Sequence, residues 1–99
     1  MVKQKILVIL GPTAVGKTAL SLDLAQSLQG EIISADSMQV YRGMDIGTAK
    51  PSPKERQRVV HHLLDVVYPD QPFNVADYVS LAEETLESLR TQEVLPLLS

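Results

Sequence analysis

Residues 5–18 read KILVILGPTAVGKT, an apolar run that leads directly into a glycine-containing loop. Branched apolar side chains fill Lys5–Leu10, which predicts a central parallel strand buried on both faces. Residues 11–18 match the pattern G-x-x-x-x-G-K followed by Ser or Thr at every fixed position. A strand, this loop and a following helix together predict an α/β protein. Its fold should be of the P-loop type, with three layers around a parallel sheet.

The loop has the chemistry of a phosphate cradle. Gly11 and Gly16 let the backbone approach an anion closely, and successive N–H groups then point at it. A helix beginning near Lys17 adds the positive end of its dipole. Lys17 supplies an ammonium for the terminal phosphate, and the Thr18 hydroxyl is a ligand for Mg²⁺. The predicted diphosphate- or nucleotide-binding residues are Gly11, Pro12, Thr13, Ala14, Val15, Gly16, Lys17 and Thr18.

The pattern after the loop predicts a βαβ unit. A helix over residues 17–28 should bury one stripe, formed by Leu20, Leu24, Leu28 and the adjacent Ala25. Gly30 stands where a helix stop belongs, and Glu31–Ala35 has the composition of a second short strand. Strand, helix and strand in this order predict a parallel crossover.

The second half predicts a further crossover. Residues 36–51 should be mostly loop, and Ser52 should cap a short helix. Residues 62–67 should be extended, and a long helix over residues 75–89 should follow. Asn74 with Asp77 should cap that helix, and its apolar face should comprise Val75, Tyr78, Val79, Ala82, Leu86 and Leu89. Residues 94–98 predict a third parallel strand.

Composition excludes several classes of protein. The chain has 99 residues and no cysteine, so disulfides and thiolate metal sites are impossible. No apolar run reaches the roughly 20 residues of a membrane span, and we expect a cytoplasmic protein. The net charge of −3 weighs against nucleic-acid binding, although residues 42–58 are locally basic. That stretch fits either RNA contact or a solvated helix face.

Asp36 is the main candidate for chemistry outside the loop. It follows the second strand, which we expect beside the first, so its carboxylate should lie near the phosphates. It could hold Mg²⁺ through water, accept a proton from a nucleophile, or simply stabilise a turn. Ser37, Gln39 and Tyr41 could hold a flat nucleobase. His61 and His62 are expected to have packing or surface roles.

Four blocks then carry a family resemblance. They are Gly11-Pro-Thr-Ala-Val-Gly-Lys-Thr18, Ser34-Ala-Asp-Ser-Met-Gln-Val-Tyr41, Met44-Asp-Ile-Gly-Thr-Ala-Lys-Pro51 and His61-His-Leu-Leu-Asp65. In this order and spacing, over nearly the whole chain, they resemble the tRNA dimethylallyltransferase family, also called tRNA isopentenyltransferases.

The resemblance implies transfer of a dimethylallyl group from dimethylallyl diphosphate to N6 of an adenosine beside the tRNA anticodon. It implies that the loop holds the diphosphate, with Lys17 and Thr18 in catalysis and Mg²⁺ on Thr18. It also implies that Asp36 is the general base. Asp36, Ser37, Met38 and Gln39 would contact an extruded target base. Lys50 and the basic residues after it would touch the RNA backbone.

The chain departs from the family at its end. The family continues into a Gly-Gly-Thr-Gly loop and tRNA-binding regions, so residues 1–99 are expected to form a partial, N-terminal P-loop domain. We expect this piece to be inactive alone and to self-associate through apolar sheet edges. Two alternatives stay open, a small-molecule or nucleotide kinase and a non-catalytic phosphate-binding fragment. A kinase usually has arginines near the transferred phosphate, and Arg42 is the only arginine close in sequence to the predicted site loops.

Overall fold

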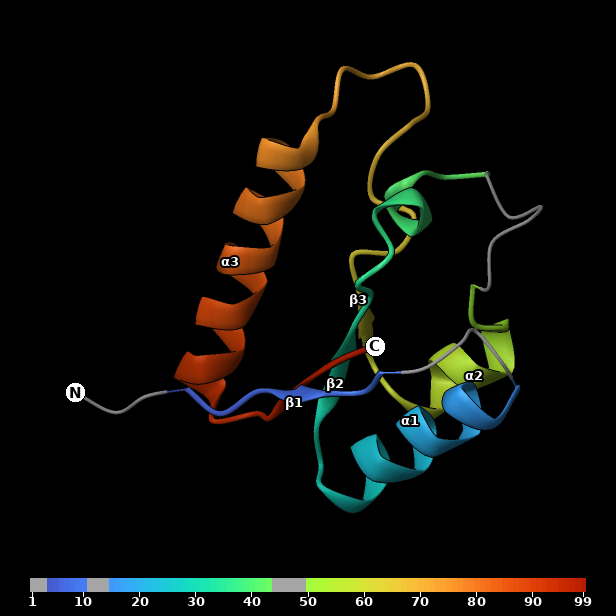
Figure 1. The fold of residues 1–99 in the computed structure, drawn as a ribbon, viewed down its shortest axis with the longest axis vertical. Helices are drawn as coiled ribbons and strands as arrows, with labels where there is room; N and C mark the ends of the chain where they lie inside the picture. The colour runs from blue at the N-terminus through green and yellow to red at the C-terminus, as the bar shows by residue number, and fades with distance from the viewer. Residues whose placement is uncertain (1–3, 11–14, 44–49) are drawn as a thin grey trace.

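The computed structural model describes residues 4–10, 15–43 and 50–99. Its elements run in the order β1 (Leu7–Val8), α1 (Val15–Ser27), β2 (Glu31–Ile33), the 3₁₀ helix η1 (Ser37–Val40), α2 (Pro53–Arg58), β3 (His61–His62), α3 (Val75–Gln92) and β4 (Pro96–Leu98). The strands pair in parallel, in the order β1-β4-β2-β3. Helices α1 and α2 lie on one side of this sheet and α3 on the other (Figure 1). The predicted three-layer α/β architecture is therefore confirmed.

Alternating side chains of the central strands supply two cores. On β2, Ile32 packs toward the α1 side and Ile33 toward the α3 side. On β4, Leu97 and Leu98 divide in the same way. This is the period-two pattern expected of strands covered on both faces.

The predicted stripe of α1 is only partly right, because Ala25 is buried and Leu24 packs against the core, but the two other predicted positions do not. Leu20 and Leu28 are 50% and 47% exposed, whereas Ser21, Leu22 and Ala25 are buried. The helix turns this second face to the sheet even though Ser21 is polar, because the Ser21 hydroxyl bonds to the Lys17 carbonyl at 2.9 Å. Spacing alone could not identify a face on which a hydroxyl is satisfied by its own helix.

The apolar face of α3 is only partly as predicted. Val75 and Val79 are 77% and 45% exposed. The other predicted positions pack in the core on this side of the sheet, as does Leu81; they are Tyr78, Ala82, Leu86 and Leu89. Both predicted capping boxes are present, Ser52 with Glu55 on α2 and Asn74 with Asp77 on α3.

The glycine at position 30 is needed for a different reason than predicted. The left-handed residue is Gln29, with φ of 54°, and not Gly30. A Cβ at Gly30 would lie 2.4 Å from Leu97 Cδ1 and 2.6 Å from the Leu95 carbonyl oxygen. The glycine therefore allows close approach of the α1–β2 turn to the segment that leads into β4.

Residues 62–67 are not continuously extended. Strand β3 includes only His61 and His62, and Leu63 and Asp65 take left-handed φ values of 64° and 52°. The chain pairs again at Val67, which forms a parallel bridge with Tyr41. These two kinks replace the single long strand that the apolar pattern predicted.

Strand β1 does not lie at the centre of the sheet. Within the described residues it pairs only with β4, so β4 separates it from β2. The expectation that β2 lies directly beside β1 is thus wrong. Ile6, Val8 and Leu10 are 44%, 49% and 86% exposed. Self-association through this apolar edge stays a prediction, which sedimentation of the chain would test.

Candidate functional site

A cavity of about 320 Å³ opens where β2 and β4 end and α1 begins. The carboxyl ends of parallel strands are the expected place for a site in such a sheet. Most of its lining residues come from α1, the segment after β2, and the segment around α2 and β3. The complete lining consists of Lys17, Thr18, Ser21, Leu22, Ile32, Ser34, Ala35, Asp36, Gln39, Lys50, Pro51, Glu55, His61, Leu64 and Ser99.

One end of the cavity is the first turn of α1. The helix begins at Val15, two residues before the position predicted, and Lys17 and Thr18 line the cavity. A Cβ built on Gly16 would meet nothing within 4 Å. Packing among the described residues therefore does not require this glycine, whereas close approach of a ligand would. Gly11, Pro12, Thr13 and Ala14 lie outside the described residues, as does the side chain of Val15.

Asp36 belongs to another part of the cavity wall, the segment after β2. It lines the same space as Lys17 and Thr18, although its strand is one place farther from β1 than expected. It caps η1, and its Oδ1 accepts the Met38 N–H at 2.9 Å. The turn role considered for Asp36 is thus real. Among the described residues, no hydrogen bond to the other carboxylate oxygen is present, so this oxygen is available for chemistry.

The predicted base-contacting residues divide into two pairs. Asp36 and Gln39 line the cavity, whereas Ser37 and Met38 are exposed and do not. Gln39 is 8% exposed, and its Oε1 accepts the Ser34 hydroxyl proton at 2.6 Å. This bond fixes the carboxamide, because its oxygen is committed to Ser34.

Helix α3 contacts the segment after β2 through Tyr78. The Tyr78 hydroxyl donates to the Ser34 carbonyl. Burial raises the pKa of Tyr78, and the negative charge of Asp36 raises it further. The phenol therefore stays a donor through the neutral pH range.

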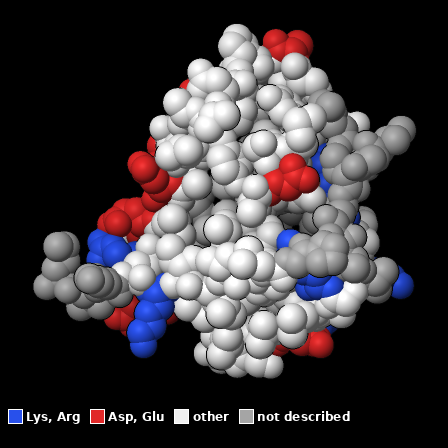
Figure 2. Space-filling model, viewed as in Figure 1, with Lys and Arg blue, Asp and Glu red and all other residues white. Residues whose placement is uncertain are grey.

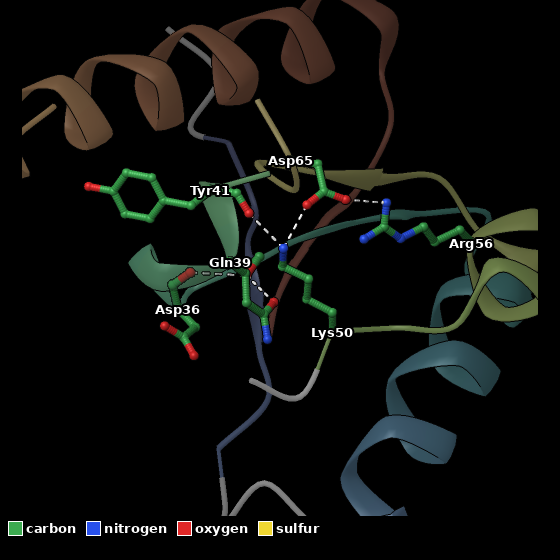
Figure 3. A network of polar contacts seen from close by, with 7 residues as sticks. Asp36, Gln39, Tyr41, Lys50, Arg56 and Asp65 are labelled. Carbon is green, nitrogen blue, oxygen red and sulfur yellow. Dashed lines mark hydrogen bonds and ion pairs between the residues drawn. The ribbon is translucent and has the colours of Figure 1, made fainter. Parts of the chain in front are cut away.

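Lys50 does not reach outward to an RNA backbone as the resemblance implied. Its side chain is 6% exposed, and its Nζ lies 2.7 Å from the Tyr41 carbonyl oxygen and 2.6 Å from Asp65 Oδ1. Arg56 holds the other oxygen of Asp65 at 2.8 Å (Figure 3). The sequence suggested an RNA contact for Lys50 because nothing local marks Asp65, fifteen residues later, as its partner.

Ser21 and Ser99 are cavity residues that sequence reasoning missed. Their hydroxyl oxygens lie 3.0 Å apart, and the Ser99 carbonyl accepts the Ala35 N–H at 2.9 Å. The available signal was position, since Ser99 directly follows the last predicted strand. A hydroxyl pair beside the first turn of α1 adds polar groups to the phosphate end.

The two histidines have the structural roles expected, but His61 also lines the cavity. Its Nδ1 donates to the Val59 carbonyl at 2.8 Å, which leaves Nε2 without a proton in the neutral ring. Burial lowers the pKa of His61, and the nearby Arg56 charge acts in the same direction. His62 Nε2 lies 2.6 Å from Glu31 Oε1 on the neighbouring strand.

The charged surface gives limited support for RNA contact. Acidic side chains gather over α3 (Figure 2). Arg58 lies 3.1 Å from Asp23, and Arg42 stacks 4.9 Å from the centre of the Tyr68 ring. Arg42 is not among the described residues that line the cavity. In the part of the chain that the structure describes, no helix has the length and apolar character needed to cross a membrane.

Comparisons with known proteins all indicate the same family. The model of the IPP transferase family matches residues 39–99, more than half of the chain. The tRNA dimethylallyltransferase of Alkaliphilus oremlandii is 53% identical over 98% of this chain and 31% of its own length. That of Roseiflexus castenholzii is 59% identical over 94% of this chain and 30% of its own length. The chain thus spans about a third of the length of these relatives.

Solved structures give the same result. The full-length tRNA isopentenylpyrophosphate transferase of Bacillus halodurans superposes with a TM-score of 0.88 at 52% identity, over 97% of this chain and 32% of that one. A eukaryotic dimethylallyltransferase acting on tRNA gives a TM-score of 0.86 at 33% identity, over 97% of this chain and 24% of that one. The chain belongs to the IPP transferase family.

Proposed function

We propose that this chain forms the diphosphate-binding and acceptor-activating part of a tRNA-modifying enzyme. The enzyme transfers a dimethylallyl group from dimethylallyl diphosphate to N6 of the adenosine beside the anticodon. One observation carries the proposal: Lys17, Thr18 and Asp36, the cationic, hydroxyl and carboxylate groups that this reaction needs, line a single cavity. The names of the relatives supply the reaction type, and the enzyme that we propose acts in the cytoplasm.

The phosphate end would stabilise the leaving group. As the C1–O bond breaks, the diphosphate oxygen gains negative charge. Lys17 and the N–H groups at the start of α1 are preorganised to stabilise that charge. Gly16 leaves room for the diphosphate to approach the backbone.

The other end would activate the acceptor. The amino nitrogen forms a bond to C1 of the dimethylallyl group and must lose one proton. Asp36 accepts that proton, so the products are the N6-substituted adenosine, diphosphate and a protonated carboxyl group that returns its proton to water. The bond from the Met38 N–H holds Asp36 in one orientation throughout.

Mg²⁺ fits the donor groups of the cavity. Thr18 would hold it together with diphosphate oxygens and water, as is usual for Mg²⁺ at phosphate sites, and the ion would supply charge neutralisation. The described residues contain no cluster of three or more carboxylate or imidazole ligands, so a site made only of their side chains is not available.

The proposal is tested in a chimera. This chain replaces the matching residues of the full-length Bacillus halodurans transferase, and transfer of labelled dimethylallyl groups to tRNA is measured. We expect activity in the chimera and a loss of about 100- to 10,000-fold with Asp36→Ala, the usual contribution of a positioned base. Asp70→Ala removes an exposed carboxylate in a turn and is the matched control. Full activity of Asp36→Ala would remove Asp36 as the base.

The alternatives predict other results. A kinase would prefer ATP over dimethylallyl diphosphate and release a phosphorylated product. A non-catalytic fragment would bind diphosphate but leave the chimera inactive. We expect the isolated chain to bind dimethylallyl diphosphate without turnover, and steady transfer by the isolated chain would contradict this.

A further inference from the structure

Lys50 is a buried cation at the wall of the cavity, and this burial needs an explanation. Its side chain is 6% exposed and its ammonium lies 2.6 Å from Asp65. A lysine in such a place is costly unless it is paired and hydrogen-bonded. The ammonium meets both conditions, since it also donates to the Tyr41 carbonyl at 2.7 Å.

Asp65 is connected to η1 and the residue after it through both its backbone and its side chain. Its backbone N–H donates to the Gln39 carbonyl at 3.0 Å, and the next N–H, from Val66, donates to the Val40 carbonyl at 2.7 Å. Its side chain returns to the same segment through Lys50, which bonds the Tyr41 carbonyl. The carbonyls of Gln39, Val40 and Tyr41 thus all accept hydrogen bonds from this network. Figure 3 shows Lys50 between the Tyr41 carbonyl and Asp65.

The charge of Asp65 supports this arrangement. Partial burial raises its pKa, but the hydrogen bonds from Lys50 and Arg56 outweigh that effect and hold the pKa below its ordinary value. Asp65 is therefore an anion at neutral pH. An anionic Asp65 holds the Lys50 ammonium in place through the contact of 2.6 Å.

Gln39 connects this network to the acceptor. Its backbone is fixed by Asp65, and its carboxamide is fixed by Ser34 and lines the cavity beside Asp36. A shift of the backbone at residues 39–41 would move the Gln39 amide relative to the target base. Displacements of this kind, about 1 Å, are enough to weaken a positioned reaction strongly.

We infer that Lys50 is a positioning residue for the acceptor, acting through the Tyr41 carbonyl and Asp65 to hold the Gln39 wall of the cavity. The inference rests on the proposed function for the nature of the acceptor, but not for the contacts. It assigns Lys50 to orientation of the base, in place of the RNA-backbone contact that the sequence suggested.

The kinetic test uses Lys50→Met in the chimera. Met keeps the length and apolar stem and removes the ammonium. We expect the KM for tRNA to rise about tenfold or more, since hydrogen bonds to charged groups have that weight. The KM for dimethylallyl diphosphate should stay within about twofold, because the described contacts of Lys50 go to Tyr41 and Asp65. Lys54→Met, which removes an exposed lysine on α2, is the control. Equal changes in both KM values would overturn the inference.

Salt dependence separates positioning from direct RNA contact. Loss of a phosphate-binding lysine reduces the slope of log affinity for tRNA against log salt by about 0.7–0.9. We expect the slope to stay unchanged in Lys50→Met. A reduced slope would overturn the inference in favour of backbone contact.

A second readout does not depend on activity. In the isolated chain, amide hydrogen exchange at Asp65 and Val66 reports their bonds to η1, and exchange at Ile32, bonded to the Val60 carbonyl, is the reference. Lys50→Met should accelerate exchange at the first two amides by about tenfold with little change at Ile32. Unchanged exchange at Asp65 and Val66 would overturn the inference even if the kinetics agreed.

The same readout covers two complications. If Lys50→Met does not fold, Arg56→Gln weakens the hold on Asp65 from its more exposed side, and the same two amides should then exchange faster. If the unsubstituted chimera transfers nothing to tRNA, the proposed function fails, while exchange still decides whether Lys50 positions η1.

Discussion

The two ends of the cavity are built in different ways. The phosphate end is built mainly on one contiguous motif, of which Lys17 and Thr18 lie in a single helical turn, and the Ser99 hydroxyl beside it comes from a distant segment. The acceptor end is assembled from distant residues, with bonds between Lys50 and Asp65 and between Tyr78 and Ser34. Local sequence therefore specifies the first end, whereas tertiary packing specifies the second. Substitutions should affect the two ends through different observables.

Lys17→Ala should give the largest effect. Removal of one preorganised donor to a developing oxyanion costs about 100- to 1000-fold in rate, and we expect this loss in transfer by the chimera. Stability should change little, because the Lys17 side chain is only partly buried. Transfer assays and thermal unfolding measure the two quantities.

Lys5→Ala is the control for Lys17, because it removes an exposed lysine on the segment that leads into β1. If Lys17→Ala lowered the melting temperature as much as the activity, the phosphate end would be a structural element and the contrast between the ends would fail.

Tyr78→Phe should act on the acceptor end through stability. It removes only the hydroxyl that donates to the Ser34 carbonyl, and a bond of this kind contributes about 0.5–1.5 kcal/mol. Urea unfolding of the isolated chain measures the loss. Ser80→Ala, an exposed position on the same helix, is the control. An unchanged free energy of unfolding would show that α3 does not hold the segment after β2.

The pH dependence of stability should report His61. Its pKa is lowered in the folded chain, so the unfolded chain binds a proton more readily in the range below about 6.5. The free energy of unfolding should therefore fall as the pH drops from about 7 to 5, by less than about 1.4 kcal/mol per pH unit for one group. His61→Gln should flatten this range. A slope that persists unchanged would assign the dependence to other groups.

The sequence was sufficient to predict the features that depend on neighbouring residues. The motif at residues 11–18, the Asn74 cap and the parallel α/β class all depend on neighbouring residues, and the cap and the class agree with the structure. It failed where partners are distant. The burial of Lys50 depends on Asp65, and the position of β2 depends on β4 inserting beside it. Spacing also could not reveal that α1 buries Ser21 in place of Leu20.

Disruption of the ion pair between Arg58 and Asp23 should give the smallest effect, although this pair joins α2 to α1. The two side chains are 43% and 73% exposed at a separation of 3.1 Å. Exposed pairs contribute about 0–1 kcal/mol, since solvent screens the charges and ordering two side chains costs entropy. A double-mutant cycle with Arg58→Gln and Asp23→Asn measures the coupling, which should decrease further in high salt. A coupling as large as that between Lys50 and Asp65 would mean that exposure does not separate the two pairs. Burial would then be no reason to single out the pair of Lys50 and Asp65 as the one that stabilises the acceptor end.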